Sequence, residues 1–235
     1  LFYFARKNSS PLKLGKTHFY GKVLLRTCTN GSSELMTNLS SSIVNSLYNL
    51  QLIKFAGENG VAAYGTIMYV NFIFVAIFIG YSIGSAPIIS YHYGAKNHDE
   101  LKNLSKKSLT LICIWAVSIF TLAQLLAAPA SKLFVGYDQS LYKMTVSGFR
   151  IYCLAFLING YNIFGSSFFT ALNNGPISAA ISFLRTLVFQ LSAVLLLPVI
   201  LGINGIWLSI SVAELFTLCV TATFFIRKAK YYHYI

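Results

Sequence analysis

The sequence contains no Asp, Glu, Lys or Arg between Glu58 and Lys96, and few buried helices of soluble proteins tolerate so long an uncharged stretch. About 20 apolar residues are enough for a helix to cross the hydrocarbon core of a bilayer. Other stretches of the chain also reach that length, and 56% of all residues are hydrophobic while only 10% are charged. Such a composition leaves too few polar side chains to cover a soluble domain. The sequence therefore predicts an all-α polytopic membrane protein.

Glycine, asparagine, proline and charged residues divide the chain into six predicted transmembrane helices. Their predicted bounds are 32–56, 61–93, 108–130, 141–172, 177–201 and 203–226. Between the second and third helices, residues 96–107 carry Leu101 and Leu104 among charges, which predicts a short amphipathic helix at the membrane interface.

Three regions follow from these bounds. Residues 1–30 are interpreted as the end of a preceding helix and a basic linker, because they are rich in Lys and turn residues and lack acids. Residues 31–227 form the predicted six-helix membrane domain, and residues 228–235 form a short tail.

Lysine and arginine are distributed unevenly between the two sides of this helix series. The rich side carries Arg6, Lys7, Lys13, Lys16, Lys22, Arg26, Lys96, Lys102, Lys106, Lys107, Arg227, Lys228 and Lys230. The other side carries only Lys54, Lys132 and Lys143. The positive-inside rule thus places the linker and the C-terminus in the cytoplasm, as expected for a multi-pass protein of the plasma membrane. The net charge of +12 is better explained by topology and by contact with anionic lipids than by nucleic-acid binding, which would need one continuous basic face.

Neither a metal site nor a catalytic site is expected. The four cysteines lack zinc-ligand spacing, so no metal or other cofactor is predicted. The stretch Gly80–Gly84 matches the Gly-x-Ser-x-Gly nucleophile pattern, but that pattern works on a strand-to-helix turn with a histidine in reach. Here it falls inside an apolar helix with no such histidine, so its glycines are interpreted as a helix-packing contact and the protein as a non-enzyme.

Polar side chains recur at steps of three or four residues, roughly so in the fifth helix, in four of the predicted helices. They are Glu34, Asn38, Ser41, Asn45, Tyr48 and Asn49; Asn159, Asn162, Ser166, Thr170 and Asn173; Ser178, Ser182, Arg185 and Gln190; and Ser211, Glu214, Thr217 and Thr221. Such faces either pair between helices or line water. Because they are long and carry charge, a hydrated cavity is the favoured interpretation.

The charged members of these faces are candidates for function. Glu214 lies roughly 18 Å along its helix from Arg227, near the middle of the bilayer. Arg150 and Arg185 reach comparable depths, and either could neutralise it. Glu214 is therefore either a structural ion pair or a protonation switch. Glu34 lies in the first turn of its predicted helix, where a carboxylate also simply stabilises the positive end of the helix dipole.

The end of the second helix has its own pattern. Pro87 removes one helical hydrogen bond, and in the corner that runs from Tyr91 to Ala95, Gly94 can adopt the positive φ that ends a helix. The corner either anchors a tilting helix at the headgroups or only stops it.

Several motifs together resemble the multidrug and toxic compound extrusion (MATE) family of transporters. "GYSIGSAPIISYHYGAKNHDELKNLSKKSL" is similar to the end of a repeat's second helix, and "NGSSELMTNLSSSIVNSLYNLQLIKFAGENGVAAYG" to the seventh helix and its turn. "SFFTALNNGP" resembles the corner between the tenth and eleventh helices, and "GINGIWLSISVAEL" the twelfth helix. The resemblance covers nearly the whole chain from about Asn30.

The resemblance implies the six-helix C-terminal lobe of a twelve-helix antiporter, with an N-terminal lobe as its missing partner. Such proteins export organic cations and amphiphiles in exchange for protons or sodium ions by alternating access. Glu34 and Glu214 match acidic or polar positions of the family, and Tyr48 and Tyr161 are expected to line the substrate path. The tenth helix offers Asn159, Tyr161 and Asn162 but no carboxylate, which argues against sodium coordination in this lobe.

Two other functions compete with this one. A lipid-linked oligosaccharide flippase of the same superfamily would need a more cationic cavity than Arg150 and Arg185 provide. A non-transporting structural subunit would not need a charged residue such as Glu214 at the midplane.

Overall fold

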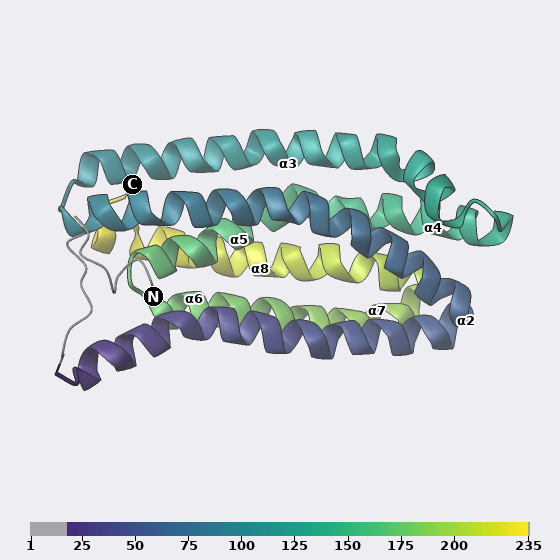
Figure 1. The fold of residues 1–235 in the computed structure, drawn as a ribbon, viewed down its shortest axis with the longest axis horizontal. Coiled ribbons are helices and arrows are strands. Elements are labelled where there is room, and N and C mark those ends of the chain that lie inside the picture. Colours follow the sequence, from purple (N-terminus) through teal and green to yellow (C-terminus); the bar gives the residue numbers. More distant parts are fainter. Residues whose placement is uncertain (1–17, 235) are drawn as a thin grey trace, which may run out of the picture.

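The computed structural model of the protein describes residues 18–234, which form helices joined by short turns (Figure 1). The elements are α2 (Gly21–Gly94), α3 (His98–Val135), α4 (Gln139–Tyr152), the 3₁₀ turn η1 (Cys153–Ala155), α5 (Phe156–Ala171), α6 (Gly175–Phe183), the π-helix η2 (Leu184–Gln190), α7 (Leu191–Leu201) and α8 (Ile203–Tyr232). No strand occurs within this described part of the chain.

Helix α2 is folded back on itself at Gly57, so that its two arms, 21–56 and 58–94, run antiparallel (Figure 1). Gly57 has φ 61° and ψ −153°, a backbone conformation that is essentially restricted to glycine. The arms correspond to the first two predicted helices. The first arm starts at Gly21 rather than at the predicted residue 32, and residues 1–17 of the predicted linker lie outside the described residues.

Five helical stretches among residues 18–234 are long and apolar enough to cross a membrane. They are Gly21–Gly94, His98–Val135, Gln139–Ala171, Gly175–Leu201 and Ile203–Tyr232. Large apolar side chains lie exposed on their outer faces, for example Ile73, Leu125 and Val199. Exposed apolar surface of this extent suits contact with lipid and not with water. The prediction of a helical multi-pass membrane protein is therefore confirmed.

Residues 98–107 are helical, as predicted for this segment, but the prediction of a separate short helix is wrong. Helix α3 begins at His98 and continues without a break to Val135. The side chain of Asn97 caps it, since its Oδ1 accepts a hydrogen bond from the backbone N–H of Glu100 at 3.2 Å. The charges in this segment suggested a boundary, but the segment contains neither Gly nor Pro, so nothing interrupts the helical hydrogen bonds.

The corner at the end of α2 closes differently from the prediction. The residue with positive φ is Lys96, at 55°, and Gly94 remains within the helix. The N–H of Lys96 donates to the carbonyl of Tyr93, and the N–H of Asn97 donates to that of His92. These two bonds form a Schellman motif, in which the left-handed residue follows the last helical residues. Pro87 lies inside α2 without ending it.

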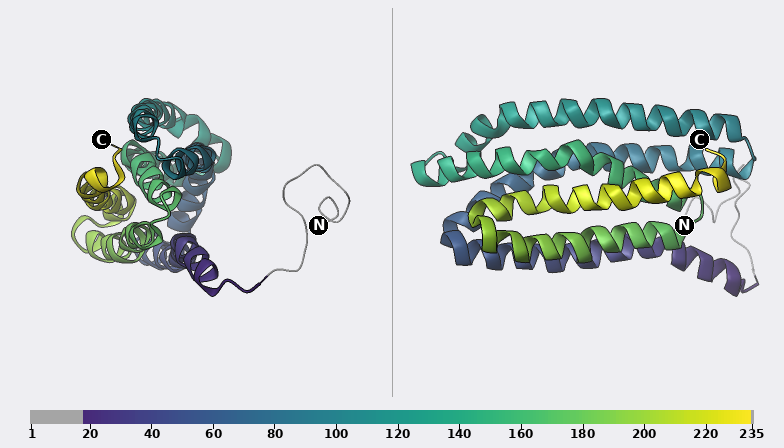
Figure 2. Two further views of the ribbon diagram at one scale, coloured as in Figure 1. Left: turned by 90° about the vertical axis from the view of Figure 1, so that its left-hand side faces the viewer. Right: turned by 180° about the vertical axis from the view of Figure 1, so that it is seen from behind.

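Helix α5 lies at the centre of the bundle, with α2, α3, α6 and α8 around it, as the end-on view of Figure 2 shows. Its aromatic residues Phe156, Phe164 and Phe168 are fully buried. The starts of α2 and α3 and the end of α8 lie at one end of the bundle, while the bend of α2 lies at the other (Figure 1). The Lys- and Arg-rich segments that belong to the described residues therefore gather at one end.

Candidate functional site

Glu214 lies in α8, and its side chain is only 2% exposed. Its Oε1 accepts hydrogen bonds from Nε and Nη2 of Arg185, at 2.9 and 2.6 Å. Its Oε2 accepts one from Nδ2 of Asn162 at 2.7 Å. A carboxylate buried this deeply is stable in its charged form only with such partners. Of the two arginines that the sequence offered, Arg185 is the partner.

Arg185 lies in the π-helix η2, which interrupts the α-helical run between α6 and α7. Besides Glu214, its Nη2 donates to Oδ1 of Asn159 at 2.5 Å. Its side chain is 21% exposed, so it is more accessible than the carboxylate it binds. Single turns of π-helix are rare and often occur at functional sites. No feature of the sequence predicted this π-helix.

Asn159 and Asn162 project from the same face of α5, as predicted. Asn159 holds the guanidinium, whereas Asn162 holds the carboxylate and also donates to the backbone carbonyl of Glu214 at 2.9 Å. Oδ1 of Asn162 is buried and has no hydrogen-bond partner among the described residues. Three elements thus assemble one network, with α5 as its centre.

Arg150 takes no part in this network. It is exposed on α4 and lines a separate hollow with Lys143 and Ser147. An ideal α-helix places Arg150 roughly half a turn away from Asn159, a signal in the sequence that separates it from the asparagine face.

A cavity of about 340 Å³ adjoins the ion pair. Its polar lining residues are Glu34, Thr37, Ser41, Ser82, Ser166, Ser167, Ser182, Arg185, Thr186, Gln190 and Glu214. They come from both arms of α2 and from α5, α6, η2 and α8. The charged residues of this lining are therefore Glu34, Arg185 and Glu214. Because Arg185 pairs with Glu214, the carboxylate of Glu34 is left without a cation in the lining.

Hydroxyl groups continue the polar surface from the cavity toward the end of α5. Oγ of Ser166 lies 2.8 Å from Oγ of Ser178 and 3.1 Å from that of Ser182. Thr170 donates to Oγ of Ser178 at 2.7 Å. These groups satisfy one another, as expected for side chains that join packed helices in a membrane.

Other predicted site residues lie elsewhere. Asn38 and Asn45 are exposed and do not line the cavity, and Oδ1 of Asn45 accepts a hydrogen bond from the hydroxyl of Tyr64, which joins the two arms of α2. Tyr48 is 1% exposed and stacks on Tyr64 with ring centroids 5.1 Å apart. Tyr161 faces a different hollow, beside Cys113.

The nucleophile-like pattern around Ser82 lies inside α2, where no strand-to-helix turn exists, and Ser82 is buried. Open space surrounds Gly80 and Gly84, so their predicted contact with another helix does not form within this part of the chain. Among residues 18–234, no three His, Cys, Asp or Glu side chains are close enough to hold a metal ion.

The fold and the site define a multi-pass helical membrane protein that keeps an ion pair and a polar cavity inside its bundle, the arrangement expected of a membrane transporter. The model of the MatE family matches residues 35–196. The chain belongs to this family of transporters, and the resemblance drawn from its motifs is confirmed.

Solved structures of transporters share the fold of this chain. The chain superimposes on a structure described as "Crystal structure of MATE in complex with MaL6" with a TM-score of 0.89 and 18% identity, covering 98% of this chain and 53% of that one. A second structure is described as "Outward-facing conformation of a multidrug resistance MATE family transporter of the MOP superfamily". Its TM-score is 0.84 and its identity 18%, and the match covers 95% of this chain and 51% of that one. The third structure is that of a MOP superfamily transporter from Pyrococcus furiosus, described as having a binding pocket of reverse polarity. Its TM-score is 0.79 and its identity 18%, and the match covers 92% of this chain and 48% of that one.

At this identity the structural likeness shows the fold. The chain spans about half the length of these solved structures. No curated protein sequence matches the chain.

Proposed function

We propose that the chain is one lobe of a secondary-active exporter, which moves organic cations or amphiphiles out of the cell in exchange for protons or sodium ions. The observation that carries this proposal is the cavity in which the Arg185–Glu214 pair lies next to the carboxylate of Glu34, which forms no ion pair among the described residues. A polar cavity whose described lining carries two carboxylates and one guanidinium, set among apolar helices, attracts a cation and disfavours an anion.

In this proposal the lobe crosses the membrane six times, because each arm of α2 acts as a separate transmembrane helix. A second six-helix lobe closes the cavity, and the two lobes rock against each other. Two solved structures with the same fold are described as outward-facing and inward-facing conformations, which supports a mechanism of alternating access. The Lys- and Arg-rich end of the bundle faces the cytoplasm of a cell with this transporter in its plasma membrane.

Coupling to the driving ion is assigned to Glu214. A proton that binds its carboxylate removes the charge that holds Arg185, while Nη2 of Arg185 keeps its bond to Asn159. Asn162 can serve both states without moving, because Oε2 still accepts from Nδ2 when the proton lies on Oε1, the oxygen that Arg185 releases. The pair can therefore open and close without leaving either charge unsolvated.

A lipid-linked oligosaccharide flippase is less well supported. Its pyrophosphate would need several cations in the cavity. Among the described residues that line the cavity, Arg185 is the only basic one, and it is already bound to Glu214.

The test is reconstitution in liposomes of the protein together with its second lobe, with ethidium efflux driven by an imposed proton or sodium gradient. E34Q should weaken ethidium binding but keep coupling. E214Q should bind ethidium yet lose gradient-driven efflux, because the variant cannot change its charge. E58Q is the matched control, since Glu58 is exposed at the bend of α2 and outside the cavity.

Normal efflux by both E34Q and E214Q would overturn the proposal. Residues 1–235 without a second lobe should transport nothing, and ion-driven efflux by this chain alone would contradict the two-lobe mechanism. A comparison of the two gradients identifies the coupling ion.

A further inference from the structure

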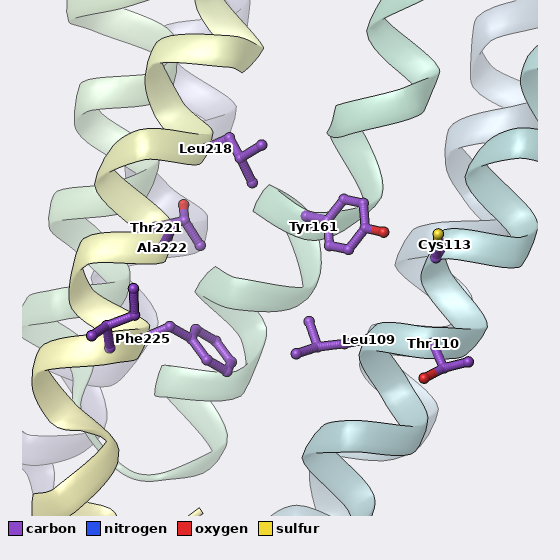
Figure 3. A pocket seen from close by; sticks show the side chains of 9 residues that line it. Leu109, Thr110, Cys113, Tyr161, Leu218, Thr221, Ala222 and Phe225 are labelled. Carbon is purple, nitrogen blue, oxygen red and sulfur yellow. The ribbon is translucent and has the colours of Figure 1, made fainter. Parts of the chain in front are cut away.

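On another face of α5, away from the ion pair, a groove of about 580 Å³ lies between α3 and α8 (Figure 3). Leu109 and Cys113 of α3 form one wall, Leu218, Ala222 and Phe225 of α8 form the other, and Tyr161 of α5 lies between them. Its volume is within the range of about 300–1,000 Å³ that is typical of sites for small molecules.

The groove is apolar and open along its length. Apart from Tyr161, its polar side chains are Thr110, Cys113 and Thr221. Thr110 already donates its hydroxyl to the backbone carbonyl of Lys106 at 3.0 Å. Cys113 and Ala222 are exposed, so the groove can be reached from the outer surface of the bundle. In a membrane that surface faces acyl chains.

One end of the groove is cationic. Lys106 lies one helical turn before Thr110 on α3, and Lys230 lies one turn after Ile226 on α8, so both are on the helix faces that form the walls. Both lysines are exposed, and neither forms an ion pair within residues 18–234. The acids nearest along α3, Asp99 and Glu100, lie more than one turn beyond Lys106. Each wall of the apolar groove is therefore followed, one helical turn on, by an exposed lysine.

We propose that this groove binds one anionic phospholipid from the leaflet at the Lys- and Arg-rich end. Its phosphate lies between Lys106 and Lys230, and an acyl chain runs past Tyr161 along the groove toward Leu218. Basic pockets between transmembrane helices are known to select anionic headgroups in this way. The cavity beside Glu34 is where a second lobe would dock, and this groove lies on another side of α5, which leaves it open to lipid. This openness to lipid rests on the proposed two-lobe arrangement and does not depend on which substrate is transported.

The probe is phosphatidylglycerol with a photoreactive group on its acyl chain, incorporated into nanodiscs that contain the protein. After illumination, cross-linked peptides are mapped by mass spectrometry. Cross-links should concentrate on Cys113, Tyr161 and Ala222. K106Q/K230Q should lower this cross-linking by at least fivefold, since each juxtamembrane charge changes lipid affinity about fivefold. A photoreactive phosphatidylcholine should label these residues weakly in both proteins.

K132Q/K143Q is the matched control, because it removes two exposed lysines from the other end of the bundle. It should leave the cross-linking unchanged. A222W, which fills the groove without altering charge, should abolish it. Equal labelling of the groove and of exposed Ile114 on α3, or equal labelling by both lipids, would show only unselective surrounding lipid and overturn the proposal. Unchanged labelling in K106Q/K230Q would do the same.

Discussion

Separate removal of each partner of the Arg185–Glu214 pair should destabilise the protein unequally. R185Q leaves a carboxylate that is 2% exposed with one amide donor, that of Asn162. E214Q leaves a guanidinium that is 21% exposed, borders the cavity and keeps its bond to Asn159. Water can reach the stranded cation more readily than the stranded anion.

The expected magnitudes follow from this difference in burial. Loss of one partner from a fully buried pair costs about 3–5 kcal/mol, which applies to R185Q. E214Q removes charge-assisted hydrogen bonds, but water can hydrate the guanidinium of Arg185 that remains. The expected loss of stability for E214Q is therefore about 1.5–3 kcal/mol. The double variant R185Q/E214Q leaves no charge behind. Its loss should therefore be smaller than the sum of the single losses by about 1–3 kcal/mol.

Thermal unfolding in nanodiscs, followed by tryptophan fluorescence, measures these differences. Trp207 is suitable because it is 1% exposed and packs against Gly148 of α4. For a chain of this size, 1 kcal/mol corresponds to about 2–4 °C in Tm. R185Q should have the lowest Tm of the three variants. A lower Tm for E214Q than for R185Q, or strictly additive losses, would refute the reasoning from burial.

Three further outcomes are expected. G57A should lose about 1–3 kcal/mol of stability in the same unfolding assay, because its φ of 61° strains any residue with a Cβ, whereas G65A, in open helical surroundings, should be neutral or slightly stabilising. In a protein without the native exposed cysteines, S41C should react with a water-soluble maleimide, because Ser41 lines the cavity. S40C should not react, because Ser40 is 0% exposed. Equal reaction of the two variants would contradict a water-filled cavity. N174A should lose about 0.5–2 kcal/mol of stability, because it removes the side-chain oxygen that caps α6. N174S keeps a capping oxygen and should retain most of that stability.

Much of the fold was predictable because a membrane imposes a simple pattern. Charge-free apolar stretches gave the helices, and the predicted helices 141–172 and 177–201 match the observed stretches Gln139–Ala171 and Gly175–Leu201 closely. The error lay in a boundary that was placed between residues 107 and 108. Residues 98–107 are helical, as predicted, but they continue into the membrane-spanning part of α3 without a break.

The site was predictable only in part. Helical spacing correctly grouped Asn159 with Asn162 and drew attention to Glu214 and Arg185. It also grouped Asn45 with Glu34, although Asn45 bonds to Tyr64 in the other arm of α2. That contact depends on how the two arms pack after the bend at Gly57, and periodicity within one helix carries no information about packing between helices.

The π-helix explains how Gln190 shares a face with Arg185, which lies five residues before it. Arg185 and Gln190 both line the cavity, although an ideal α-helix would place residues five apart roughly 140° from each other. In a π-helix each backbone N–H donates to the carbonyl five residues before it, and the N–H of Leu191 donates to the carbonyl of Thr186 in this way. Residues five apart therefore lie on nearly the same face of the helix. The widened turn thus brings Gln190 to the face of Arg185 and aligns both with the cavity. The proposed mechanism requires this ion pair to open and close, and the irregular turn lies at the residue that would have to move, Arg185.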